Sequence, residues 1–208
     1  MIIAVDGPTA SGKGTIAKAL AAHLGIPYLD TGLLYRAVGR QVQLSGGDPD
    51  NAQDALAACK FNDVLLDDEL LRSEEVGGLA SRVSVHPEVR EALFQKQRDF
   101  AQQPGGALLD GRDIGTIIAP DADVKLFITA SVQARAQRRW LEMQGREIDI
   151  PLTEIEQDVV ARDARDINRK DAPLKAAPDA FVMDTTSFNK DQAIAMAIET
   201  VEQAIGKT

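Results

Sequence analysis

The chain has 208 residues, of which 44% are hydrophobic, and this is enough for one compact domain with a proper core. Its formal net charge of −9 argues against a nucleic-acid or anionic-membrane partner, because both are bound by extended basic patches. The single cysteine, Cys59, excludes an internal disulfide and a cysteine-based zinc cluster. With no signal segment at the start and no membrane-length apolar run, these features favour a cytoplasmic protein.

The first fifteen residues combine an apolar run with a glycine-rich turn. Residues 2–5 predict a strand buried on both faces of a parallel sheet. The turn has the G-x-x-x-x-G-K spacing of a phosphate-binding loop, whose glycines let backbone N–H groups approach an anion. Lys13 is the candidate cation for the β- and γ-phosphates, and Thr15 is a candidate phosphate or Mg²⁺ contact. The candidate nucleotide-binding residues are Gly7, Pro8, Thr9, Ala10, Ser11, Gly12, Lys13, Gly14 and Thr15. An ordinary glycine turn is the alternative.

The next elements alternate between helix and strand. Apolar residues at i, i+4 and i+8 predict a helix over 16–24, followed by a short strand over 28–30 and a second helix from Thr31. Ligands of an α/β sheet bind at the carboxyl ends of its strands, so Asp30, Thr31 and Arg36 are expected near the site.

Residues 38–87 interrupt this alternation and are predicted to form an inserted subdomain. Within it, 45–54 is loop-like, and 61–66 with 70–72 predict a small antiparallel hairpin. Pro87 then begins a helix that ends before Pro104.

Three further strands are predicted over 107–110, 124–128 and 180–184, and an amphipathic helix closes the chain. Gly145 and Pro151 interrupt a largely helical, arginine-rich stretch between the last two strands. Five strands alternating with helices predict an α/β fold, a three-layer sandwich with a five-stranded parallel sheet.

Arginine is concentrated in one part of the chain. Seven of the fourteen arginines fall within 135–169, which indicates a local polyanion site of nucleotide size in an otherwise acidic protein. Along 162–169, positions 162, 165/166 and 169 share one helix face; intrahelical Arg–Asp pairs are the alternative to phosphate binding there.

A second cluster follows the third strand. Asp110 ends that strand, where a carboxylate can reach Mg²⁺ beside a phosphate-binding loop, although a turn cap would also explain it. Arg112 and Asp113 lie on the glycine-flanked turn after it, and they suit a phosphate and an amino-bearing base such as cytosine. A surface salt-bridged turn is the other interpretation.

Other conspicuous residues favour ordinary roles. His23 and His86 have no carboxylate or cysteine at catalytic spacing, which argues against a nucleophilic triad. Cys59 is expected to be a small packed residue. Trp140 either packs against the sheet or lies near an adenine.

At this point the sequence resembles the bacterial cytidylate (CMP) kinase family over nearly its whole length. The motifs that carry the resemblance are the loop at 7–15, Leu29-Asp30-Thr31-Gly32 with Tyr35-Arg36, Val89 to Leu93, Asp110 to Thr116, the Arg162/Asp166/Arg169 series with Ala172-Pro173-Leu174, and Asp184-Thr185-Thr186. The chain departs from the family pattern at Leu33-Leu34 and in an insertion shorter than in many members.

The resemblance implies a P-loop kinase fold with a core (1–37 and 88–208), a monophosphate-binding insertion (38–87) and a lid at about 138–153. By position, Thr31, Arg36, Arg112 and Arg169 would hold the CMP phosphate, Ser81, Arg90 and Asp113 would read cytosine, and Arg162 and Asp166 would contact ribose. Lys13, Arg112 and Arg169 would be catalytic, Arg138 would bind ATP, and Thr15 and Asp110 would hold Mg²⁺.

The implied reaction is ATP + CMP → ADP + CDP, with dCMP as a further acceptor and Mg²⁺ as the cofactor. We expect a monomer with no nucleic-acid or membrane partner. Alternatives are another small-molecule P-loop kinase, acting on UMP or a metabolite hydroxyl, and a P-loop switch protein. The guanine-reading Asn-Lys-x-Asp pattern of such a switch is matched only imperfectly, by Asn189-Lys190-Asp191-Gln192.

Overall fold

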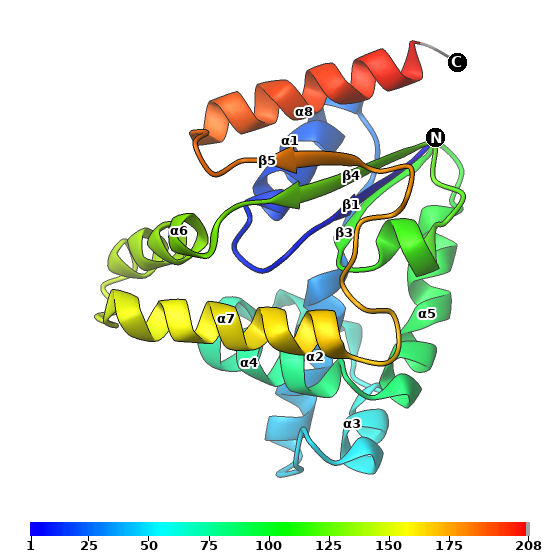
Figure 1. The fold of residues 1–208 in the computed structure, drawn as a ribbon. Coiled ribbons are helices and arrows are strands. Elements are labelled where there is room, and N and C mark those ends of the chain that lie inside the picture. Colours follow the sequence, from blue (N-terminus) through cyan, green and yellow to red (C-terminus); the bar gives the residue numbers. More distant parts are fainter. Residues whose placement is uncertain (207–208) are drawn as a thin grey trace.

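A five-stranded, wholly parallel sheet organises the protein in the computed structural model, which describes residues 1–206 (Figure 1). The strand order is β2-β3-β1-β4-β5. The strands span Ile2–Asp6 (β1), Tyr28–Asp30 (β2), Ala107–Gly111 (β3), Val124–Thr129 (β4) and Phe181–Asp184 (β5). The predicted fold class and all five predicted strands are confirmed.

Helices cover both faces of the sheet, as its apolar strands require. On one face, α1 (Lys13–Leu24) and α8 (Lys190–Ile205) pack on the alternate side chains Ile3 and Val5 of β1. On the other face, α5 (Pro87–Ala101) and the short π-helical turn η3 (Ile114–Ile118) pack on Ala4 and Leu109. Because both faces of β1 and β3 are buried, their sequences are nearly continuous apolar runs.

The carboxyl ends of β1, β2 and β3 lie side by side, since Asp6 pairs with Gly111 and Asp30 with Asp110 in the strand register. The phosphate-binding loop leaves β1 at this edge, and α2 (Thr31–Leu44) leaves β2 there. Segments distant in sequence therefore meet at one edge of the sheet.

The part of the chain predicted to be an insertion is helical. It contains the second half of α2, then α3 (Ala52–Ala58) and α4 (Glu74–Val83). Together with the first half of α2 and with α5, it encloses a separate apolar core that includes Leu34, Val38 and Val83. In Figure 1 it extends away from the sheet, on the side opposite α8. Since α2 runs through residue 38 without a break, the insertion and the sheet layer share a continuous helix.

The predicted hairpin over 61–72 is wrong. Two short 3₁₀ helices occupy this segment, η1 (Asp63–Asp67) and η2 (Glu69–Arg72). Each is capped by the preceding polar side chain: Asn62 accepts from the Val64 N–H at 3.0 Å and Asp68 from the Leu70 N–H at 2.9 Å. Such local side-chain bonds compete with strand pairing, and this favours turns.

Two helices form the arginine-rich part of the chain, α6 (Val132–Gln144) and α7 (Leu152–Asn168). They pack on each other through Met143, Ile155 and Val159, with Trp140 beside this cluster. Their connection contains Gly145 and Pro151, as the sequence predicted, and falls within the predicted lid. In Figure 1 the two helices project from the sheet on the side where the strands end.

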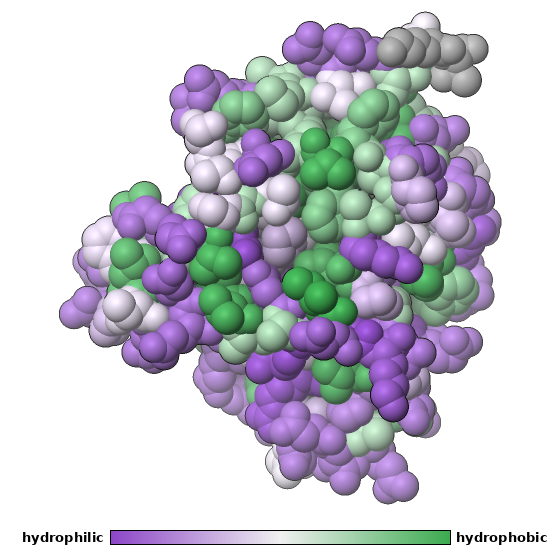
Figure 2. All heavy atoms as spheres, in the orientation of Figure 1, coloured by the Kyte–Doolittle hydropathy of each residue, from purple (hydrophilic) through white to green (hydrophobic). Residues whose placement is uncertain are grey.

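The surface is mostly hydrophilic over the insertion, whereas apolar residues gather over β5 and α8 on the face shown in Figure 2. β5 is an edge strand, and Phe181 and Val182 are exposed on it. Among residues 1–206 no helix is both long and apolar enough to cross a membrane.

Gly7 is predicted to tolerate substitution less well than Gly25. Both have positive φ, but a Cβ on Gly7 would lie 2.0 Å from the Ile128 carbonyl oxygen, whereas one on Gly25 would meet no atom within 4 Å. Gly25→Ala should therefore cost only the left-handed backbone strain, about 1–2 kcal/mol of unfolding free energy. Gly7→Ala should cost more, because β4 or the loop must move. Urea unfolding measures both variants, and equal losses would contradict this account.

Candidate active site

A cavity of about 690 Å³ opens at the carboxyl edge of the sheet, a size typical of small-molecule sites. The phosphate-binding loop and the start of α1 form its floor through residues 9–16. Its other walls come from four further parts of the chain: Asp30, Gly32 and Arg36; Asp110, Gly111 and Arg112; Arg138, Arg139, Glu142 and Arg162; and Thr185, Phe188, Asn189, Lys190 and Ala193.

A smaller cavity of about 100 Å³ adjoins it, between the sheet edge, α4 and the end of α7. The two cavities share lining residues, among them Arg36, Arg112 and Arg162. Three guanidinium groups therefore lie where the cavities meet.

The residues predicted to bind CMP and those predicted to bind ATP line the two cavities, and three of the CMP-binding residues line both. All nine predicted CMP-binding residues line the smaller one: Thr31, Arg36, Ser81, Arg90, Arg112, Asp113, Arg162, Asp166 and Arg169. Thr9 to Thr15 and Arg138 line the larger one, together with Asp110. Gly7 and Pro8, the first two residues of the loop, are buried and line neither cavity.

The phosphate-binding loop is shaped by backbone conformations that favour glycine. Gly12 has φ +87° and directly precedes α1, so the N-terminus of that helix faces the larger cavity. A Cβ on Gly14 would lie 3.1 Å from an Asp110 carboxylate oxygen, which shows how closely the carboxylate approaches the loop. This is a ready-made anion site with a carboxylate at its side.

Arg138 ties the loop to the turn after β5. Its guanidinium donates to the Ser11 carbonyl at 3.2 Å and to the Thr185 hydroxyl at 3.1 Å, and also to the carbonyl of Thr185. Arg138, which was predicted to bind ATP, is thus held beside the loop mainly by backbone carbonyl oxygens.

Buried ion pairs hold the smaller cavity together. Asp113 pairs with Arg90, and the Arg169 guanidinium lies 3.6 Å from the other Asp113 oxygen. Arg112 donates from Nε to Asp166 at 2.8 Å, which joins the turn after β3 to α7. Arg112 and Asp113 thus form salt bridges, but these lie within the cavity lining, so the alternative of a surface salt-bridged turn does not describe them.

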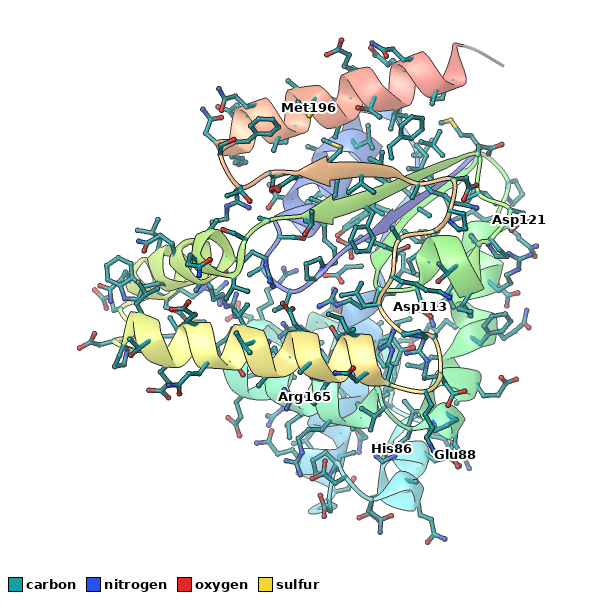
Figure 3. The ribbon with its side chains drawn as sticks, in the orientation of Figure 1. His86, Glu88, Asp113, Asp121, Arg165 and Met196 are labelled. Carbon is teal, nitrogen blue, oxygen red and sulfur yellow. The ribbon has the colours of Figure 1, made fainter. Side chains whose placement is uncertain are left out.

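The insertion reaches the same cavity through α4. Arg165 Nε donates to the Ser81 hydroxyl at 2.9 Å, and Arg165 lies on the side of α7 that faces α4 (Figure 3). Asp113, also labelled in Figure 3, lies in the interior between α7 and α5.

The residues expected to have ordinary roles lie away from both cavities. His23 pairs with Glu202 at 2.9 Å, and His86 contacts the Pro49 carbonyl at 2.9 Å, far from the sheet edge (Figure 3). Cys59 is half-buried, and burial raises its pKa to about 11, so it is a poor nucleophile. Trp140 packs between α6 and α7, neither on the sheet nor on the cavity lining.

Several cavity residues were not predicted as site residues. Arg139 and Glu142 lie one helical turn apart on α6, and Phe188, Asn189 and Lys190 lead into α8. The arginine concentration was a signal for Arg139. The turn before α8 carries Asp184-Thr185-Thr186 and the imperfect Asn189-Lys190-Asp191-Gln192 pattern, but neither assigned a site role to Phe188, Asn189 or Lys190.

A family model described as cytidylate kinase matches residues 3–203. The chain belongs to the cytidylate kinase family. This confirms the resemblance seen in the sequence and makes the protein a nucleoside monophosphate kinase.

Cytidylate kinases of other bacteria are similar along their whole length. One from Methylocella silvestris is 52% identical over 205 residues, which are 98% of this chain and 95% of that protein. One from Rhodospirillum rubrum is 48% identical over 213 residues, with 100% of both chains covered. Among solved structures, an uncharacterized protein from Eubacterium ventriosum has a TM-score of 0.56 at 16% identity, covering 97% of this chain and 98% of that one, and this likeness concerns the fold alone.

The candidate site brings charges together at a cost. Burial and the neighbouring Asp30 carboxylate raise the pKa of Asp110 to about 7, against the effect of Lys13. Burial and the nearby Arg112 guanidinium lower the pKa of Lys13 to about 8. Perturbed titration of this kind is typical of functional sites.

The donor set beside the loop suits a hard cation such as Mg²⁺. Asp110 provides a carboxylate and Thr15 a hydroxyl on the same cavity, and a cation would relieve the repulsion between Asp110 and Asp30. Residues 1–206 contain no group of three or more His, Cys, Asp or Glu side chains that could hold a metal alone. Mg²⁺ is commonly held by one or two carboxylates together with substrate phosphates and water, and Asp110 could be such a carboxylate.

Asp110→Asn should change how stability depends on pH. The folded-state pKa of Asp110 lies above its ordinary value of 3.8, so the folded state holds this proton more tightly, and the stabilisation is present at low pH and lost as pH rises through about 7. Asparagine does not titrate. The unfolding free energy of the ligand-free wild type, relative to the variant, should therefore fall between pH 5 and pH 7.5. A constant difference in urea unfolding at the two pH values would refute the raised pKa.

Proposed function

We propose that this protein transfers the γ-phosphoryl group of ATP to CMP, and to dCMP, forming CDP or dCDP. The observation that carries the proposal is the pair of adjoining cavities, one on a phosphate-binding loop and one lined by acidic and basic groups, with Arg36, Arg112 and Arg162 at their junction. A donor and an acceptor phosphate bound in the two cavities would meet beside these guanidinium groups.

In the proposed complex the acceptor nucleotide occupies the smaller cavity. Arg36, Arg112 and Arg169 hold the CMP phosphate with Thr31, because guanidinium groups bind phosphate oxygens in a bidentate manner. Asp113, Arg90 and Ser81 read the base, since the Asp113 carboxylate can accept a hydrogen bond from the cytosine amino group. Arg162 and Asp166 contact the ribose.

The chemistry needs positioning and charge more than proton transfer. The second pKa of a phosphate monoester is about 6, so the acceptor is largely dianionic at neutral pH and needs no strong general base. Lys13 neutralises the transferring phosphoryl group from the donor side, and the arginines at the junction orient the attacking oxygen. The remoteness of both histidines from the cavities supports this mechanism.

ATP occupies the larger cavity with its phosphates on residues 9–15 and Arg138 beside them. Mg²⁺, held by Asp110 and Thr15 directly or through water, would neutralise charge on the donor phosphates. We further propose that residues 38–87 act as the acceptor-binding insertion and that about 138–153 act as a lid. Their closure would exclude water, the competing acceptor.

The direct test is ADP release measured with CMP, dCMP, UMP and AMP as acceptors. The proposal expects CMP and dCMP to be phosphorylated fastest and ATP to be hydrolysed slowly when no acceptor is present. Fastest turnover with UMP or AMP would refute the acceptor assignment. Tight GTP binding with no phosphoryl acceptor would instead identify a nucleotide switch.

Lys13→Ala should separate acceptor binding from transfer. Lys13 lines only the larger cavity, so calorimetry should give a CMP dissociation constant close to that of the wild type. Removing a preorganised cation at the developing charge should lower kcat by about 10²-fold or more. Near-normal kcat in the ADP-release assay would contradict the role of Lys13.

A further inference from the structure

Glu74 links the predicted insertion, of which it is part, to the arginine-rich helices. It is the first residue of α4, and its carboxylate pairs with Arg139 of α6 and, at 3.0 Å, with Arg162 of α7. One side chain of the insertion thus contacts a guanidinium group on each of the two helices that flank the predicted lid.

Both partners of Glu74 face the cavities, but Glu74 does not. Arg139 lines the larger cavity, and Arg162 lines both. Glu74 lines neither cavity, and its side chain is only 27% exposed. The carboxylate therefore pairs with the two guanidinium groups without itself lining the cavities that they line.

Without the Glu74 carboxylate, Arg139 would be tied only to its own helix, and Arg162 would keep only its bond to the Glu74 backbone carbonyl, at 3.2 Å, in addition to its own helix. Arg139 would keep Glu142 at 2.6 Å, one turn along α6, and Arg162 would keep Asp158 at 2.8 Å, one turn along α7. Neither pair crosses to the insertion. A weaker crossing contact lies nearby, where the exposed Arg146 donates to the Arg72 carbonyl at 3.3 Å.

Repulsion among the arginines explains why a carboxylate is needed at this point. The pKa of Arg36 is lowered to about 10 by burial and by the nearby charges of Arg162 and Arg139. The Arg36 guanidinium itself donates to the carbonyls of Leu71 and Ser73, in the three residues before Glu74. Three like charges are thus gathered around the first turn of α4, where Glu74 supplies a negative charge.

We propose that Glu74 is a positioning residue that couples closure of the insertion to the placement of Arg139 and Arg162 at the phosphoryl-transfer junction. This proposal rests on the proposed kinase function. It assigns Glu74 to the closed, reacting arrangement and not to the binding of CMP by itself. Arg162 keeps its bond to the Glu74 backbone carbonyl when the side chain changes, and Ser81, Arg90 and Asp113 are held by other partners.

Glu74→Gln tests the proposal, because it removes the charge and keeps the size of the side chain. Its neighbour Glu75 offers a matched control. Glu75 is exposed on the same turn of α4, and its carboxylate accepts a hydrogen bond from the Gln43 side chain. Glu74→Gln should lower kcat about tenfold or more, since small misplacements of catalytic groups are costly. It should also raise the share of ATP lost to water, while the dissociation constant for CMP alone changes by less than about threefold. Glu75→Gln should match the wild type in all three measurements.

A double-mutant cycle with Arg139→Met tests the route of the effect. Glu74→Gln should cost much less activity when Arg139 is already absent, because the two residues act together. Thermal unfolding of each variant shows whether it is folded. If Glu74→Gln is not folded, Glu74→Asp replaces it in the test. Aspartate keeps the charge and should restore folding, but with a partial loss of kcat, since the shorter side chain cannot reach both arginines.

Three results would overturn the proposal: equal kcat for Glu74→Gln and Glu75→Gln, a loss confined to CMP affinity, or a gain in activity, which would mean that Glu74 competes with phosphate. Failure of the kinase function itself is separate, because it would appear as absent CMP turnover in the wild type and in Glu75→Gln.

Discussion

Holding several guanidinium groups close together in a half-buried cleft, ready for phosphates, is the constraint on which this structure depends. Arg36, Arg112 and Arg162 line both cavities, and the charges of Arg162, Arg139 and Arg112 all lower the pKa of Arg36. Such a cluster is unfavourable unless each member has partners that do not occupy its phosphate-facing side. The surrounding architecture supplies those partners.

The arginines at the junction are held by two parts of the chain, α7 and the insertion. Arg112 follows β3 and bonds to Asp166 of α7, while Arg162 bonds to Glu74 of the insertion. Arg36 uses backbone carbonyls of the insertion and needs no carboxylate. The site therefore exists only when sheet, insertion and arginine-rich helices are assembled. This links the fold directly to the proposed two-substrate reaction.

The core of this architecture was predictable from the sequence because its signals are local. Apolar runs such as 2–5 and 124–128 specify buried strands, and the glycine spacing around Lys13 specifies the loop and the helix after it. The motif at 110–116 and the arginine series at 162–169 predicted which residues would share a cavity, because strand ends of a parallel sheet lie together.

What the sequence did not predict depends on contacts between distant segments. The hairpin over 61–72 failed because the caps Asn62 and Asp68 outweigh a weak apolar alternation. Glu74 and Arg139 carry no motif, and their importance follows from the packing of α4 against α7 and of α6 against α7. Trp140 left two choices open, and the structure shows a third, since it packs between α6 and α7.

The central claim is that the two cavities bind two nucleotides whose phosphates meet at the arginine junction. Its most direct test is calorimetry with a compound in which adenosine and cytidine are joined 5′ to 5′ through a polyphosphate chain. The account predicts that this compound binds at one site per chain, far more tightly than ATP or CMP, and excludes both. Binding no tighter than ATP, or competition with only one of the two nucleotides, would contradict it.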